Sequence, residues 1–154
     1  MHIVNYRDFF NCFVDPNTNH LTHSCSFPRR QTKGSVGFDL YLPERIVVDC
    51  LNSKPIVVPM GICVNIPSGC YCEIHIRSSI AMTYNICLAN SVGIIDSDYK
   101  GQIKLLLNNF SDNDVELTRG ERIAQLIPIN FLIDDSHIDK NVRVGGFGST
   151  NNFN

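Results

Sequence analysis

From Gly34 onwards the sequence is a succession of short apolar runs separated by glycine, proline, asparagine or aspartate, and this texture constrains the fold most strongly. The runs include FDLYL, PIVVPMGICVNI, CYCEIHI, QIKLLLNNF and RIAQLIPINFLI. Many short strands that end at turn-forming residues are typical of an all-β barrel or sandwich. Three prolines disfavour helices in the middle of the chain, at positions 55, 59 and 67. We therefore predict an all-β fold.

The run CYCEIHI predicts a strand with two different faces, because its residue types alternate. One face carries Cys70, Cys72, Ile74 and Ile76, and the other carries Tyr71, Glu73, His75 and Arg77. A zinc site shared by the two thiols and His75 is not expected, because the imidazole falls on the opposite face. The seven cysteines are odd in number and scattered, which fits reduced thiols in an intracellular protein.

One short helix is predicted after this strand. Ser78 and Ser79 are good helix-capping residues, and the helix would continue through Met82 and end by Asn85. Residues 1–33 have an apolar start and then a polar, proline-containing stretch, which we interpret as one strand and a long loop. The apolar rhythm stops near Asp134. We expect a β domain over residues 1–133 and a flexible C-terminal arm over residues 134–154.

Length and charge exclude several classes of partner. A chain of 154 residues is one domain by the usual size prior and buries roughly 70% of its unfolded surface. Lys and Arg number 13 against 15 Asp and Glu, without a basic run, so a nucleic-acid polymer is not expected as a partner. Neither a signal peptide nor a membrane span is recognised. We expect an intracellular protein, cytoplasmic or nuclear, that is not secreted and does not bind membranes.

The segment GIIDSDYKG, Gly93 to Gly101, is the most informative one for function. Two apolar residues lead into a polar tip with a glycine exit, which predicts a tight β-hairpin. Hydrolysis of a phosphoanhydride requires an activated water, and a carboxylate such as that of Asp96 can take its proton. The alternative is a solvated turn in which Asp96 binds backbone amides.

Five segments together resemble the five motifs of the trimeric dUTPases, in the same order and at similar spacing. They are GSVGFDLY (34–41), IRSSIAM (76–82), the Gly93–Gly101 segment, RGERIAQLIP (119–128) and GGFGST (145–150). One such motif alone is weak, whereas five in order are specific. The resemblance spans about residues 34–150. It implies a dUTPase-type distorted jelly-roll β-barrel with one short helix and an extended C-terminal arm, assembled as a homotrimer.

The resemblance also implies a reaction, the hydrolysis of dUTP to dUMP and pyrophosphate with Mg²⁺. Such a reaction limits uracil incorporation into DNA and supplies dUMP for thymidylate synthesis. Asp96 matches the family's catalytic base, which activates the water that attacks the α-phosphorus. The family's active sites lie between subunits: the first, second and fourth motifs come largely from one chain, the third from another and the arm from a third.

Further matches concern recognition of the nucleoside. They are Asn90, Gly93, Ile95, Tyr99 and Lys104. Backbone groups of the Gly93–Gly101 segment read uracil in the family, together with the asparagine. The ring of Tyr99 would fill the space beside C2′ and exclude a ribose hydroxyl; alternatively it is a packing residue. Lys104 would lie near the nucleotide, although an ordinary exposed lysine is an equal alternative.

The remaining matches concern the triphosphate. Those in the body of the chain are Arg77, Ser78, Ser79 and Gln125, and those in the arm are Arg143, Phe147, Gly148 and Ser149. Backbone amides at a helix start attract anions, and glycines let the arm close over a ligand. The sequence departs from the family pattern in two places. Ile76 and Ser79 replace a proline and a glycine of the second motif, and the arginine of the arm lies one position nearer Phe147. Asp39 would hold Mg²⁺ through water, or it is an internal structural carboxylate.

Two alternatives to a dUTPase follow from the sequence. A dCTP deaminase shares the fold and the Arg-Ser-Ser triplet, but it needs a glutamate on the strand after the third motif. Leu106 occupies that position and cannot move protons, which disfavours this enzyme. The second alternative is a non-catalytic dUTPase-like binding or regulatory protein, which the altered fifth motif leaves open.

Overall fold

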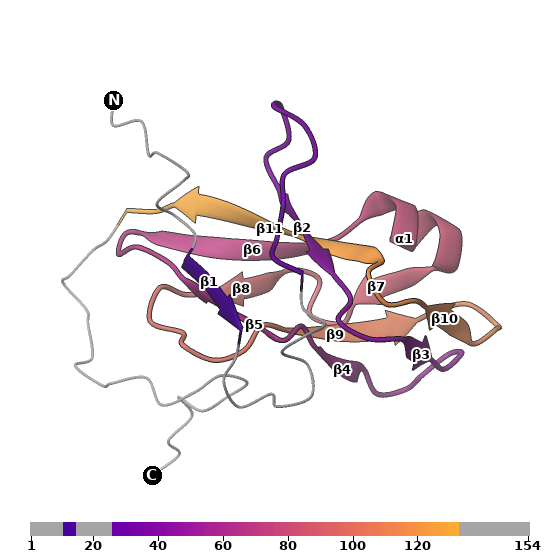
Figure 1. The fold of residues 1–154 in the computed structure, drawn as a ribbon. Coiled ribbons are helices and arrows are strands. Elements are labelled where there is room, and N and C mark those ends of the chain that lie inside the picture. The colour runs from indigo at the N-terminus through magenta and orange to yellow at the C-terminus, as the bar shows by residue number, and fades with distance from the viewer. Residues whose placement is uncertain (1–10, 15–25, 133–154) are drawn as a thin grey trace, which may run out of the picture.

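The computed structural model describes residues 11–14 and 26–132, and these form eleven strands and one short helix (Figure 1). The strands are β1 (Asn11–Val14), β2 (Phe38–Tyr41), β3 (Ile46–Val48), β4 (Ile56–Pro59), β5 (Ile62–Asn65), β6 (Cys70–Ile76), β7 (Ile86–Leu88), β8 (Gly93–Ile95), β9 (Lys104–Asn109), β10 (Val115–Leu117) and β11 (Arg122–Asn130). The helix is α1 (Ser78–Tyr84). The predicted all-β class with one short helix is confirmed.

The strands form four antiparallel sheets. The largest has the order β2-β11-β6-β8, and a three-stranded sheet has the order β4-β9-β7. Two-stranded sheets, β1-β5 and β10-β3, complete the set. In Figure 1 the strands β2, β11 and β6 form an upper layer over β9, β4 and β3. One apolar core fills the space between the layers, with Leu40, Ile74 and Leu126 from the upper sheet and Leu105 and Leu107 from the lower one.

Strand β6 has the two faces that the sequence predicts. Cys70, Cys72 and Ile74 are buried, whereas Tyr71, Glu73 and His75 are partly exposed. The strand pairs with β11 from Ala124, opposite Ile76, to Asn130, opposite Cys70. Among the described residues there is no group of His, Cys, Asp and Glu that could hold a metal ion. In the same part of the chain, no helix has the length and apolar character needed to cross a bilayer.

Helix α1 lies where the sequence predicts it, but its first residues differ from the expectation. Arg77, not a serine, is the N-cap residue, and it makes no side-chain capping hydrogen bond. The reason is the hand-over from β6: the Arg77 amide still donates to the Ile123 carbonyl at 3.0 Å, so the helix can begin only at Ser78. Asn85 ends the helix in the left-handed conformation, with φ 53°.

The predicted hairpin over Gly93–Gly101 is wrong. Strand β8 pairs with β6, and the chain then crosses to the other sheet, where β9 pairs with β4 and β7. The physical reason is the pairing of Ile103, which is fully buried. Its amide donates to the Ile62 carbonyl at 2.8 Å, and its carbonyl accepts from the Met60 amide at 2.9 Å. The backbone after the turn therefore bonds to the β4–β5 connection instead of β8.

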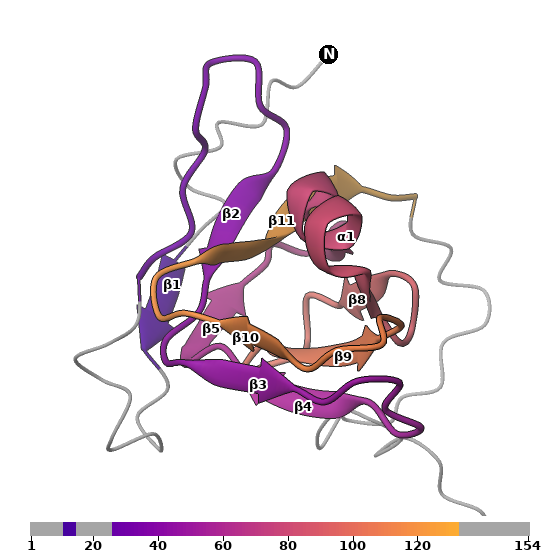
Figure 2. The ribbon, with the colours of Figure 1, turned by 90° about the vertical axis from the view of Figure 1, so that its right-hand side faces the viewer.

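The N-terminal part contains the strand β1, which pairs with β5. The apolar start of the chain lies outside the described residues, and so does the predicted arm with Arg143, Phe147, Gly148 and Ser149. The segment before β2 projects away from the sheets as a long loop (Figure 2). The loop is held by the Arg30 side chain, which donates to the carbonyls of Ser35 and Lys33, each at 2.6 Å.

Candidate active site

Three of the five sequence motifs meet at the carboxylate of Asp39. This residue lies in β2, opposite Gln125 of β11, and Gln125 in turn lies opposite His75 of β6. The Gln125 side chain donates from Nε2 to Asp39 Oδ1 at 3.1 Å. Arg122 donates from Nη1 to Oδ2 at 3.0 Å, and Arg77 Nε lies 3.6 Å from Oδ1. The structure thus brings the predicted residues Asp39, Arg77 and Gln125 together.

The Asp39 cluster, defined as Asp39, Arg77, Arg122 and Gln125, carries one more positive than negative charge. Asp39 is 1% exposed, whereas both arginine side chains remain partly exposed. A carboxylate that binds two guanidinium groups fixes their orientation, because the planar fork of arginine is directional. Ser78 and Ser79 follow directly and are exposed at the start of α1. The arrangement is suited to an anion such as a phosphate group.

Two residues of this cluster region were not assigned from the sequence. Arg122 lies in the fourth motif, and its carbonyl also accepts a hydrogen bond from Arg77 Nη1 at 3.1 Å. Gly37 lies in the first motif, and a Cβ there would lie 3.0–3.2 Å from side-chain atoms of Gln125. A larger residue at position 37 would therefore displace Gln125. The motif matches were the available signal for both, but only the fold shows the contacts.

Asp39 does not fit the role of a direct metal ligand. Its side chain is 2% exposed, and its two oxygens already bind the side chains of Gln125, Arg122 and Arg77. These contacts favour the alternative interpretation, an internal structural carboxylate. Mg²⁺ in nucleotide-hydrolysing sites is commonly held by substrate phosphates and water, so the described residues need not form a cage for it. The water-mediated role of Asp39 stays a prediction.

The Asp96 loop, residues 96–103, begins where β8 ends. Asp96 is partly exposed, and its carbonyl accepts a hydrogen bond from the Tyr99 amide at 3.1 Å, which closes a turn. The Tyr99 hydroxyl donates to the Gln102 carbonyl at 2.8 Å, and the ring packs against the core. The Tyr99 ring is therefore fixed in place. This is expected both for a residue that only packs against the core and for one that contacts the substrate.

Strand β8 is the last strand of its sheet among the described residues, so one of its edges is not paired with another strand. Alternate backbone groups of an edge strand point away from its neighbour and can bind a ligand. Gly93 and Ile95 are alternate residues of β8, and Asn90 is exposed in the turn that precedes it. Lys104 is exposed at the start of β9, on the other sheet.

The Asp96 loop and the Asp39 cluster lie at opposite ends of β6. Ile95 lies opposite Cys72, so the loop starts at that end of the strand, whereas Arg77 and Ser78 follow Ile76 at the other end. The steps from Cys72 to Ser78 correspond to about 20 Å at ~3.3 Å per residue. One chain therefore does not bring Asp96 to its own Ser78.

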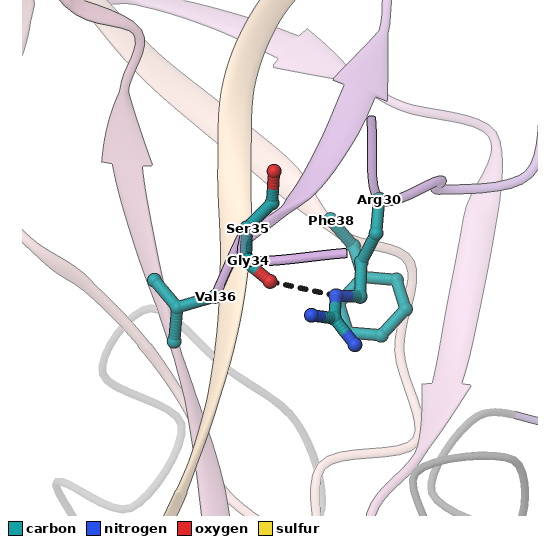
Figure 3. A pocket seen from close by; sticks show the side chains of 5 residues that line it. All are labelled: Arg30, Gly34, Ser35, Val36 and Phe38. Atoms are coloured by element: carbon teal, nitrogen blue, oxygen red, sulfur yellow. Dashed lines mark hydrogen bonds between the residues drawn. The ribbon is translucent and has the colours of Figure 1, made fainter. Parts of the chain in front are cut away.

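A small pocket lies beside the loop that precedes β2. It has a volume of about 190 Å³ and is lined by Arg30, Gly34, Ser35, Val36 and Phe38 (Figure 3). The guanidinium of Arg30 lies over the ring of Phe38 in this view, and its Nε donates to the Ser35 carbonyl. No sequence motif predicted this pocket.

Comparisons with known proteins agree with the motif matches. The family model described as dUTPase matches residues 23–151. A deoxyuridine 5'-triphosphate nucleotidohydrolase of Helicobacter pylori J99 is 37% identical over 128 residues, which cover 80% of this chain and 87% of that protein. The dUTPase structure from Streptococcus mutans has a TM-score of 0.69 at 27% identity, covering 80% of this chain and 98% of the other.

A more distant structure shows the fold alone. It is a mutant dUTPase from Staphylococcus aureus phage phi11, with a TM-score of 0.70 at 17% identity, covering 86% of this chain and 97% of the other. A structural Mg(II) ion is coordinated in that protein.

Proposed function

This chain belongs to the dUTPase family, and from that premise we propose which residues carry its reaction. The reaction is the hydrolysis of dUTP to dUMP and pyrophosphate. It lowers the dUTP available to a polymerase and supplies dUMP for thymidylate synthesis. The alternative reaction, deamination of dCTP, is not favoured: Leu106 occupies the middle of β9, where that enzyme would need a glutamate.

Asp96 is the general base in this proposal. Its carboxylate takes a proton from the water that attacks the α-phosphorus, and pyrophosphate leaves. Asp96 lies at the start of a turn that the Tyr99 amide closes by donating to the Asp96 carbonyl, and this bond fixes the backbone that carries the carboxylate. Asp96 therefore needs phosphate-binding groups from another copy of the chain. Those of its own chain lie at the other end of β6, about 20 Å along the strand.

The nucleoside is read by the strand and loop around Asp96. The unpaired edge of β8 supplies backbone groups of Gly93 and Ile95 to the uracil edge, and Asn90 adds a side-chain amide. The anchored ring of Tyr99 excludes a 2′-hydroxyl. A cytosine presents donor and acceptor in reverse order and leaves those backbone groups unpaired, which costs binding energy. Lys104 is assigned to the same nucleotide.

The triphosphate binds at the Asp39 cluster. Arg77 and Gln125 contact phosphate oxygens, and the exposed Ser78 and Ser79 add hydroxyl and amide donors. We assign Arg143, Phe147, Gly148 and Ser149 of the arm to closing over the same substrate. The excess positive charge of the cluster supports this assignment, because a triphosphate is strongly anionic. Mg²⁺, when bound, would shield the charge of the substrate phosphates and would be held mainly by them and by water. No described residue is assigned as its direct ligand.

The observation that carries the proposal is the separation of Asp96 from the Asp39 cluster along β6. A complete site requires Asp96 from one copy and the cluster from another, which a homotrimer with sites between subunits provides. The enzyme is placed inside the cell, where dUTP arises. Among the described residues, the thiols of Cys50, Cys70, Cys72 and Cys87 form no disulfide, which is consistent with a reducing compartment.

Subunit mixing tests the proposal. Asp96→Asn and Arg77→Ala are each expected to be inactive as homo-oligomers. After denaturation and joint refolding in equal amounts, about a quarter of the sites should combine an intact cluster with an intact Asp96, by random assortment in a symmetric oligomer. Pyrophosphate release from dUTP measures the recovery, and dCTP and UTP test specificity.

The matched control mixes Asp96→Asn with the double variant Asp96→Asn/Arg77→Ala, which contains no intact Asp96 and should stay inactive. Failure of the first mixture to recover activity would contradict the shared site. A wild-type protein that binds dUTP but releases no pyrophosphate would instead favour the non-catalytic alternative.

A further inference from the structure

The outward face of the largest sheet combines apolar side chains with a connected polar network. We define the β6 face by six residues: Tyr71, Glu73, His75, Ile94, Ile127 and Ile129. Their side chains point away from the core, since they alternate with buried residues along their strands. In register, Ile127 and Ile94 flank Glu73 on either side, and Ile129 lies opposite Tyr71. Isoleucines on both neighbouring strands thus flank the Glu73 carboxylate.

Both oxygens of Glu73 are already paired within the strand. Tyr71 donates from its hydroxyl to Oε1 at 2.9 Å, and His75 Nε2 lies 2.8 Å from Oε2. The ring of Tyr71 is itself held edge-on against Phe131, with centroids 5.9 Å apart. The Glu73 side chain is 24% exposed, and residue Ile94 is 50% exposed.

A face that stays in water gains little from such a network. Exposed ion pairs contribute about 0–1 kcal/mol in measured cases, because water screens them and ordering the side chains costs entropy. The hydrogen bonds matter more on a face that becomes buried. A carboxylate enclosed by isoleucines must have its oxygens paired before water leaves, or the desolvation penalty prevents association. The Glu73 network meets that requirement in advance.

The position of the β6 face identifies what covers it. The face runs along β6 between the Asp96 loop at one end and the Asp39 cluster at the other, and His75 lies directly opposite Gln125. In the proposed shared site, a second copy brings its Asp96 loop to the Asp39 cluster, and this cluster adjoins the His75 end of the β6 face. Continuity with the proposed shared site, together with exposed Ile94 and partly exposed Ile127 and Ile129, points to another copy of this chain as the occupant.

We propose that copies of this chain associate through the β6 face, with the Tyr71–Glu73–His75 network as its polar centre that keeps Glu73 paired when the face is buried. The inference rests on the proposed active site shared between copies and deepens it. It names the contact surface and gives the network a role in association, separate from binding or hydrolysis of dUTP.

A pair of variants tests this role at pH 8, where Glu73 is ionised. Tyr71→Phe/His75→Leu removes both partners and leaves the carboxylate alone among apolar groups. Self-association, measured by sedimentation over a range of concentrations, should weaken by at least about a hundredfold, because an uncompensated buried charge is strongly unfavourable. Adding Glu73→Leu removes the charge itself and should restore association to near the wild-type level.

The matched control is Arg45→Ala, which leaves Glu116 of β10 without its exposed partner and should not change association. Circular dichroism of each variant checks that the β fold is retained. A Tyr71→Phe/His75→Leu protein that associates like the wild type would overturn the inference, and so would a loss that Glu73→Leu does not rescue. In those cases the subunit-mixing result still stands, so the shared site and the β6 face fail separately. A wild-type protein that is fully active as a monomer would contradict both the shared active site and association through the β6 face.

Discussion

Gln125 on β11 donates a hydrogen bond from Nε2 to Oδ1 of Asp39 on β2, at 3.1 Å, and this contact joins the first and fourth motifs. Arg77 and Arg122 bind the same carboxylate, so one buried acid orients three side chains. The Asp39 carboxylate is therefore a positioning group in the proposed site, since its own oxygens are occupied by protein donors.

Asp39→Asn should destabilise the protein and weaken substrate binding. An asparagine keeps the shape but removes the charge that compensates the two arginines, and its amide group opposes their donors. We expect a loss of about 2–3 kcal/mol in the free energy of unfolding, below the usual cost for a fully buried pair because both arginines are partly exposed. KM for dUTP should rise. Denaturant unfolding and steady-state kinetics measure the two effects.

Arg45→Ala is the matched control for Asp39→Asn, because it breaks a salt bridge whose partners are 60% and 52% exposed. Such pairs contribute about 0–1 kcal/mol, so stability and KM should change little. Equal losses in the two variants would show that the burial of Asp39 has no special importance.

The contribution of Glu73 to stability should disappear in acid. Hydrogen bonds from His75 and then Tyr71 hold the pKa of the Glu73 carboxyl below its ordinary value. Its contribution is therefore fully present above the ordinary glutamate pKa of about 4.3 and is lost as the pH falls through the lower folded-state pKa. The difference in melting temperature between the wild type and Glu73→Gln should be constant near neutrality and shrink on acidification. A difference that grows in acid would contradict the assigned direction.

Cys72 should resist alkylation in the native protein. Burial, with a smaller effect from Cys70, raises the pKa of Cys72 to about 12, so almost no thiolate exists at pH 8. Cys50 is exposed and should react first, even though its hydrogen bond to Asp114 raises the pKa of this thiol too. Mass spectrometry after limited treatment with iodoacetamide distinguishes the two sites. Early labelling of Cys72 would contradict its placement on the buried face of β6, and unfolded protein is the control.

Local patterns predicted those parts of the fold that local physics decides. The alternation in CYCEIHI identified both faces of β6, and the residues around Ser78 identified the short helix. The hairpin prediction failed because the pairing of Ile103 with Met60 and Ile62 depends on a segment some 40 positions away, which no local pattern contains.

The candidate site shows the same division. Residue identities at Asp39, Gln125 and Asp96 followed from the motifs. The ion pair between Arg122 and Asp39 joins residues 83 positions apart in the chain, so only the β2–β11 register reveals it. The family resemblance predicts that Asp96 lies far from Ser78 of its own chain. The β6–β8 register supports this prediction, because the two residues lie beyond opposite ends of β6. The Tyr71–Glu73–His75 network lies within one predicted strand, but its hydrogen bonds required side-chain positions.

Gly101→Ala should disturb Tyr99 and with it the discrimination against ribose. A Cβ at position 101 would lie 2.6 Å from the Tyr99 hydroxyl oxygen and 2.7 Å from Cζ, closer than real contacts allow. The backbone at Gly101 does not have a positive φ, so the expected cost comes from the clash with the ring and not from backbone strain. The ring must move and lose its hydrogen bond to the Gln102 carbonyl. We expect a stability loss of about 1–3 kcal/mol, as for other overpacked sites.

The kinetic consequence of Gly101→Ala is a narrower preference for dUTP over UTP, in the same direction as Tyr99→Ala, because a displaced ring no longer fills the space beside C2′. Gly34→Ala is the matched control: it lies in the first motif, and a Cβ there meets no atom within 4 Å. It should leave both stability and the preference unchanged. If Gly101→Ala loses stability but still hydrolyses no UTP, Tyr99 is a packing residue, and another group must exclude the ribose hydroxyl.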